Sequence, residues 1–100
     1  MSAYVIGEVQ ITNPAGMKGY GPMVAAAVQQ YGGRYLARGA TPEVLEGGPA
    51  NNILIIEFDD VAAAKRWFAS PEYAAAMEKR MGKGEIDLVI VEGYDGVQPG

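Results

Sequence analysis

With 100 residues, of which 49% are hydrophobic and 20% charged, the chain has the size and balance of one folded globular domain. Its net charge of −4 disfavours nucleic acids and anionic membrane surfaces as partners, because both attract basic protein surfaces. The lack of cysteine and histidine excludes disulfides, thiolate nucleophiles and histidine bases, and it leaves no usual nitrogen or sulfur ligand for a metal.

The first predicted elements are a strand and a helix that is broken near its start. Residues 4–11 alternate between apolar and mixed side chains, as a strand with one buried face does. Asn13 can cap a helix, but Gly21 interrupts the apolar stripe that follows, and Pro22 is tolerated only in a first turn. We therefore expect the main helix at residues 22–31, ended by the glycine pair directly after it.

Three further strands are predicted along the chain. The second strand covers residues 34–39, with Arg34, Leu36 and Arg38 on one face. The segment EVLEG could continue this strand, and GGPANN predicts a turn. The third and fourth strands, which are apolar on both faces, cover residues 52–58 and 88–91.

The helical segment between the last two strands is predicted in two parts. Asp59 or Asp60 can cap the first part, and Ser70 can cap the second, with Pro71 as its first residue. Apolar residues at helical spacing form one face of both parts. This face consists of Val61, Ala64, Phe68, Ala74, Met77 and Met81, with Trp67 beside it.

The order strand, helix, strand, strand, helix, strand predicts an α+β fold, the ferredoxin-like βαββαβ sandwich. In this fold a four-stranded antiparallel sheet carries its helices on one face. The whole chain, residues 1–100, is expected to be a single domain, with a loose tail from about residue 94.

The apolar character of both faces of the third and fourth strands predicts a second cover for the sheet. Exposing their aliphatic side chains would forfeit about 1.5–3 kcal/mol each. A second copy of the chain, related by two-fold symmetry, is the simplest cover for the helix-free sheet face, so we expect a homodimer. The alternative is a sheet that merely tolerates aliphatic residues on its open face.

Three charged side chains on the predicted strands are candidates for a functional site. The arginine pair Arg34 and Arg38 could grip a carboxylate or phenolate through parallel hydrogen bonds. A buried carboxylate has a raised pKa, so Glu57 could act as a general base. In the structural alternative, Arg38 pairs with Glu57 on the neighbouring strand and Arg34 is exposed.

Two aromatic residues are candidates for a pocket lining. Tyr20 lies beside the expected helix break, where a cleft could open, and Trp67 lies on the second helical segment. An aromatic stripe at helical spacing also suits a protein core. A cavity between sheet and helices, with Arg38 or Glu57 pointing into it, would favour a binding site.

The segments YVIGEVQITNP, YGGRYLARG, EVLEG, IIEFDD, AAKRWFASPEY and LVIVEGYDG follow one another along the chain. With them the chain resembles a family of small bacterial proteins known as domain of unknown function 1330. The resemblance implies a dimeric α/β barrel of the ferredoxin-like group. That group includes cofactor-free monooxygenases of antibiotic biosynthesis, muconolactone isomerases and polyketide cyclases, in which small, often aromatic molecules bind between sheet and helices.

Two functions are left open at this point. The chain could be a cofactor-free isomerase, cyclase or monooxygenase, in which Arg38 and Glu57 do the chemistry and Tyr20, Arg34, Arg38 and Trp67 bind a small aromatic or acidic compound. It could instead be a non-catalytic ligand-binding or structural dimer. The chain shows no signal sequence and no apolar run near the roughly 18 residues of a membrane span. We therefore expect a cytoplasmic protein, with neither metal nor cofactor.

Overall fold

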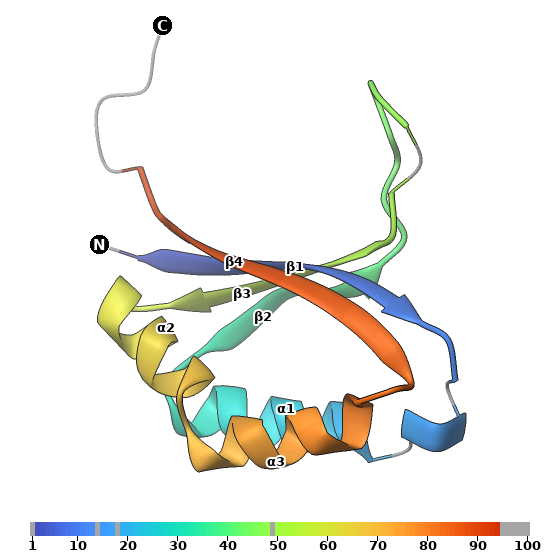
Figure 1. Cartoon of the computed structure of the whole chain (residues 1–100). Coiled ribbons are helices and arrows are strands. Elements are labelled where there is room, and N and C mark those ends of the chain that lie inside the picture. Colours follow the sequence, from blue (N-terminus) through green and yellow to red (C-terminus); the bar gives the residue numbers. More distant parts are fainter. Residues whose placement is uncertain (1, 14, 18, 49, 95–100) are drawn as a thin grey trace, which may run out of the picture.

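The computed structural model describes residues 2–13, 15–17, 19–48 and 50–94. Its sheet is antiparallel and four-stranded in the order β2-β3-β1-β4, and the helices lie on one face of it (Figure 1), as predicted. The elements along the chain are β1 (Ala3–Ile11), η1 (Ala15–Met17), α1 (Tyr20–Gln30), β2 (Arg34–Ala40), β3 (Asn52–Phe58), α2 (Val61–Phe68), α3 (Pro71–Arg80) and β4 (Gly84–Glu92).

Helices α2 and α3 begin where a side chain satisfies one of their free backbone N–H groups. Asp60 accepts from the Ala63 N–H at 2.7 Å to cap α2, and Ser70 accepts from the Tyr73 N–H at 3.1 Å to cap α3. The first helix begins at Tyr20, two residues earlier than expected, because Pro22 still falls within its first turn. Asn13 accepts from Gly16 at the short η1 turn, and Pro14 lies outside the described residues.

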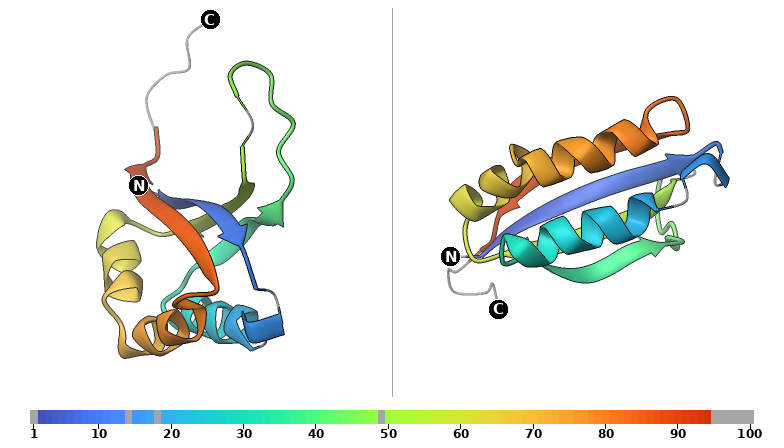
Figure 2. Two further views of the ribbon diagram at one scale, coloured as in Figure 1. Left: turned by 45° about the vertical axis from the view of Figure 1, so that its right-hand side comes forward. Right: turned by 90° about the horizontal axis from the view of Figure 1, so that it is seen from below.

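The core lies between the helices and the sheet face that points toward them. Trp67 is 1% exposed, and its ring packs 5.6 Å from the Phe58 ring and 4.6 Å from the Tyr73 ring. Helices α1 and α3 pack side by side beneath the sheet (Figure 2), and Tyr31 at the end of α1 donates to Glu72 on α3 at 2.6 Å. The aromatic cluster therefore joins the helices to β3.

Three expectations about helix faces are wrong. Ala74 is exposed, because Tyr73 and Ala76 occupy the inward positions of α3. Phe68 is 49% exposed, because the large indole of Trp67 occupies the inward position with Ala63 and Ala64 one turn earlier. Met81 is 69% exposed, because α3 ends one residue before it. Met77, in contrast, packs against the core as expected.

Two β-bulges in β2 move its residues from one face of the sheet to the other. Arg34 pairs with Glu57, and a register shift between Tyr35 and Ala37 inserts one extra residue into the strand. Arg38 consequently pairs with Leu54, on the face that carries the helices. The expectation that both arginines share one face is therefore wrong, because a single added residue reverses the alternation.

The connection between β2 and β3 leaves the sheet on the side away from the helices (Figure 1). The segment EVLEG, residues 43–47, is not a strand as expected but lies in this arm. Leu45 within it is 89% exposed. The ladder between β2 and β3 ends at the pair of Ala40 and Ile53, and EVLEG lies in the connection between the two strands.

The sheet face without helices, called here the helix-free face, is apolar at its centre. Ile6 of β1 pairs with Ile55 of β3 on one side and with Val89 of β4 on the other. Val89 is 56% exposed, and Val91 also lies open. The prediction that β3 and β4 carry aliphatic side chains on both faces is confirmed. Within the described ranges, none of the helices has the length and apolar content to cross a membrane.

Gly39 makes the second bulge possible and gives a test of it. Its φ of 71° is left-handed, with no neighbouring atom where a Cβ would lie. We expect Gly39→Ala to lower the free energy of unfolding by about 1–2 kcal/mol, since the cost is one of backbone conformation. Urea unfolding measures it against Gly48→Ala, which has open space and no left-handed φ. Equal stability of the two variants would contradict this role.

Candidate functional site

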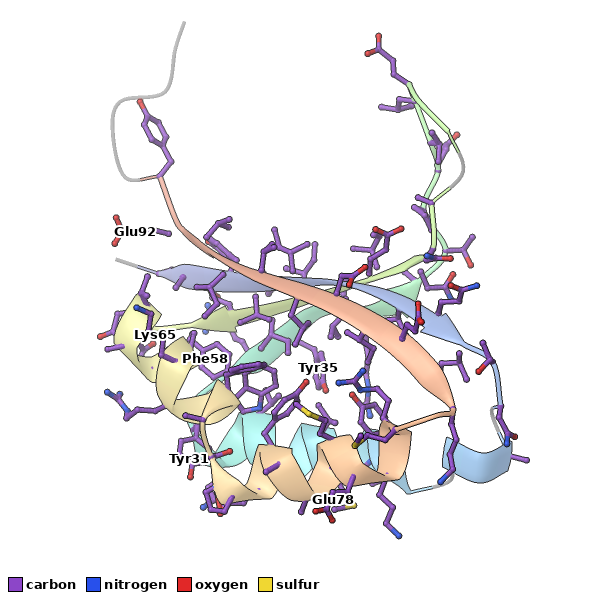
Figure 3. All side chains as sticks on the ribbon, in the orientation of Figure 1. Tyr31, Tyr35, Phe58, Lys65, Glu78 and Glu92 are labelled. Atoms are coloured by element: carbon purple, nitrogen blue, oxygen red, sulfur yellow. The ribbon has the colours of Figure 1, made fainter. Side chains whose placement is uncertain are left out.

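A cleft opens between the first turn of α1 and the underside of the sheet, and we call it the Tyr20 cleft. Its volume is about 280 Å³. The polar residues that line it are Tyr20 on α1 and Tyr35 and Arg38 on β2, and none of the described residues in its lining is acidic. Figure 3 shows the Tyr35 side chain extending from the sheet toward the helices. Its apolar walls are Val9, Ile11, Val24, Leu54 and Ile86.

Arg38 is held at the edge of this cleft by two weak contacts. Its Nη2 donates to the Gly21 carbonyl at 3.3 Å, and its guanidinium lies over the Tyr35 ring, 4.8 Å from the centroid. Within the described residues, no carboxylate is ion-paired with it. The arginine therefore keeps several N–H donors for a bound molecule.

The tyrosines near the cleft are neutral hydrogen-bonding groups at neutral pH. Burial raises the pKa of Tyr20 to about 12, against the opposing effect of the nearby Arg80 charge. Burial likewise raises the pKa of Tyr35, although the positive charge of Arg38 works against it. These side chains can donate or accept a hydrogen bond, but neither can serve as a base near neutrality.

Behind Tyr20, two more residues complete a polar cluster inside the helical layer. Arg80 of α3 donates to the Tyr20 and Tyr73 oxygens, and Tyr20 donates its own O–H to the Tyr73 oxygen. Burial raises the pKa of Tyr73, although Arg80 opposes this. Arg80 was not singled out from the sequence. Its spacing of seven residues from Tyr73, two helical turns, was the signal that it shares a face with that tyrosine.

Glu57 and Arg34 are placed on the helix-free face, away from the Tyr20 cleft, and form an ion pair with each other. Partial burial acts to raise the Glu57 pKa, but hydrogen bonds from Ser2, Arg34 and Tyr4, together with the Arg34 charge, hold it below its usual value. Glu57 is thus ionised and satisfied at neutral pH. The pair expected between Arg38 and Glu57 is replaced by one between Arg34 and Glu57, because the register of the β2–β3 ladder places Arg34 opposite Glu57.

Trp67 borders a separate cavity of about 200 Å³ rather than the Tyr20 cleft. Val5, Phe68, Leu88 and Ile90 complete its apolar lining. The indole Nε1 is buried, and no residue that the structure describes is hydrogen-bonded to it. The structure therefore places Tyr20 and Arg38 in one cleft, and it places Trp67, Arg34 and Glu57 outside that cleft. A binding site shared by all of these residues stays a prediction.

Solved structures with the same fold include proteins of unknown function and an oxygenase. RPA0582 of Rhodopseudomonas palustris, a protein of unknown function, is 17% identical with a TM-score of 0.71, over 95% of this chain and 84% of that one. SnoaB of Streptomyces nogalater, a cofactor-independent oxygenase, is 11% identical with a TM-score of 0.65, over 98% of both chains. A dimeric protein of unknown function and ferredoxin-like fold from Bacteroides fragilis is 16% identical with a TM-score of 0.61, over 92% and 96%.

These likenesses show the ferredoxin-like fold, and a family match is more specific. A comparison with curated protein sequences finds no match. Residues 2–94, nearly the whole chain, match the family described as domain of unknown function (DUF1330). The segments that suggested this family from the sequence run through the sheet and helices described above. The chain therefore belongs to the DUF1330 family.

Proposed function

We propose that this chain is the subunit of a homodimer that binds a small aromatic or acidic compound in the Tyr20 cleft and acts on it without a cofactor. The observation that carries this proposal is an apolar cleft with an arginine at its edge and, among the residues that the structure describes, no acidic side chain in its lining. SnoaB, which shares the fold, is a cofactor-independent oxygenase. Reactions of the isomerase, cyclase or monooxygenase type fit such a cleft.

The size and lining of the cleft limit the compound that it takes. Its volume of about 280 Å³ lies just below the roughly 300–1,000 Å³ of ligand pockets, which favours a compound of one or two rings. Aliphatic walls suit an apolar ring, and Arg38 suits an anionic group on that ring. Tyr20 and Arg38 are the residues to which we assign ligand binding.

A non-catalytic ligand-binding dimer is the second candidate, and one observation favours it. No lining residue ionises near neutral pH as a base would, since the acids are absent and burial raises the pKa values of Tyr20 and Tyr35. A catalytic cleft of this kind would promote loss of a proton by stabilising the anion instead. Turnover of a bound compound, followed by mass spectrometry, separates the two candidates.

The homodimer is proposed to form through the helix-free face. Burial of each aliphatic side chain there contributes about 1.5–3 kcal/mol, and Val89 and Val91 are both open in the single chain. One self-complementary patch suffices for a two-fold dimer. The exposed Leu45 arm rises on the same side, where a second subunit would meet it. The B. fragilis protein with this fold is dimeric. We place the dimer in the bacterial cytoplasm.

Ligand binding is tested with benzoate, salicylate and naphthoate in a thermal-shift experiment. Any of them that binds only the folded state raises the melting temperature. We expect Arg38→Gln to weaken this binding about tenfold or more, since it removes a charge-assisted hydrogen bond. Isothermal titration measures the loss.

Arg34→Gln is the matched control, because Arg34 is the same residue type on the same strand but on the opposite face. We expect it to bind these acids as the unchanged protein does. No binding by any aromatic acid, or equal losses in both arginine variants, would contradict the assignment of the Tyr20 cleft.

The dimer is tested by light scattering at micromolar concentration, where we expect twice the 10.6 kDa of one chain. Val89→Glu places a charge at the centre of the helix-free face and should shift the mass to that of one chain. Ala75→Glu is the control, because Ala75 is exposed on α3, away from this face. A monomeric unchanged protein, or a dimer that survives Val89→Glu, argues against this interface.

A further inference from the structure

The cluster of Tyr20, Tyr73 and Arg80 carries a positive charge without a negative partner. Arg80 is hydrogen-bonded to both tyrosine hydroxyls, and within the described residues no carboxylate is ion-paired with it. Its position in the last turn of α3 offsets part of the charge, since the C-terminal end of a helix is partly negative. Phenol hydroxyls supply no further negative charge, so the cluster stays cationic.

The same cluster has more hydrogen-bond donors than acceptors. A guanidinium offers five N–H groups and accepts nothing, and each phenol offers one O–H and one oxygen. Arg80 Nε is buried and has no hydrogen-bond partner among the described residues. A bound anion that accepts hydrogen bonds would supply both the missing negative charge and the missing acceptor.

Tyr20 connects this cluster to the cleft, because it belongs to both. Arg80 donates to the Tyr20 oxygen and thereby makes the Tyr20 O–H a stronger donor, as hydrogen-bonded chains do. This O–H is donated to Tyr73 in the free protein and would turn to a bound oxyanion, while Arg80 keeps the Tyr73 oxygen hydrogen-bonded. Arg38 adds a second cation at the edge of the same cleft. An anionic oxygen in the cleft would thus meet positive charge from β2 and, through Tyr20, from α3.

We propose that Tyr20, polarised by Arg80, and Arg38 together form a site for a ring oxyanion, so that the compound bound is a phenol or enol taken in its ionised form. This inference rests on the proposed function and specifies its substrate class. On ionisation the O–H bond of the compound breaks, the proton passes to water, and the electron pair stays on the oxygen, where these donors stabilise it. Tyr20 touches the ligand, and Arg80 is a positioning residue that acts through it.

The test uses 4-nitrophenol, whose absorbance reports its ionisation, in a pH titration with the unchanged dimeric protein. We expect the bound nitrophenol to ionise at lower pH than the free compound. Tyr20→Phe should weaken nitrophenolate binding about tenfold or more, the loss of a hydrogen bond to a charged group. Arg80→Met should remove at least half of the shift in ionisation.

Arg66→Met is the matched control, because Arg66 is exposed on α2 and away from the cleft; we expect its shift to equal that of the unchanged protein. Circular dichroism checks the fold of each variant. If Arg80→Met does not fold, the ionisation shift in the unchanged protein and its change in Tyr20→Phe still test the oxyanion site.

Nitrobenzene, a neutral compound of similar shape, separates this inference from the proposed function. If nitrobenzene binds but nitrophenol ionises as it does in water, the cleft binds aromatic rings and the oxyanion site is wrong. An unchanged shift in Tyr20→Phe also overturns the inference. If neither compound binds, the inference fails together with the assignment of the cleft.

Discussion

The helices cover only one face of the sheet, and this constraint determines the surroundings of every strand side chain. On the covered face, Phe58 and its neighbours pack with Trp67 and Tyr73 to form the core. On the other face, Ile6, Ile55 and Val89 lie in one row across three strands without a helix above them. The core therefore stabilises the single chain, whereas the open row is the surface that a second subunit would bury.

The charged side chains on the two faces of the sheet also differ in whether they have a partner of opposite charge. On the helix-free face, the Arg34 guanidinium meets the Glu57 carboxylate, and the pKa of Glu57 lies below its usual value. On the helix side, the partners of Arg38 and Arg80 within the described part of the chain are carbonyl, phenol or aromatic groups. A chain of net charge −4 thus has a cationic cleft. Low-dielectric walls strengthen such a local field, which supports binding of an anion there.

The chemistry proposed for the cleft follows from the kinds of groups that surround it. A protein without histidine has few side chains that exchange protons near neutral pH, and burial moves the pKa of Tyr20 further from that range. Fixed donors beside apolar walls can instead favour the ionised form of a weakly acidic ring. Stabilising the anion in this way requires a positioned hydroxyl and a positive charge, and it does not require a general base in the cleft.

Local sequence determined the strands, the caps at Asp60 and Ser70, and the aliphatic character of both sheet faces, because each depends on the periodicity or backbone chemistry of neighbouring residues. Family membership was likewise readable from the sequence, since its segments run along most of the chain. Tertiary structure alone decided which sheet face carries Arg38 and which residues surround Arg80. Alternation counts residues along one strand, whereas a bulge arises only when β2 pairs with β3, and Tyr20 meets Arg80 only when α1 packs against α3.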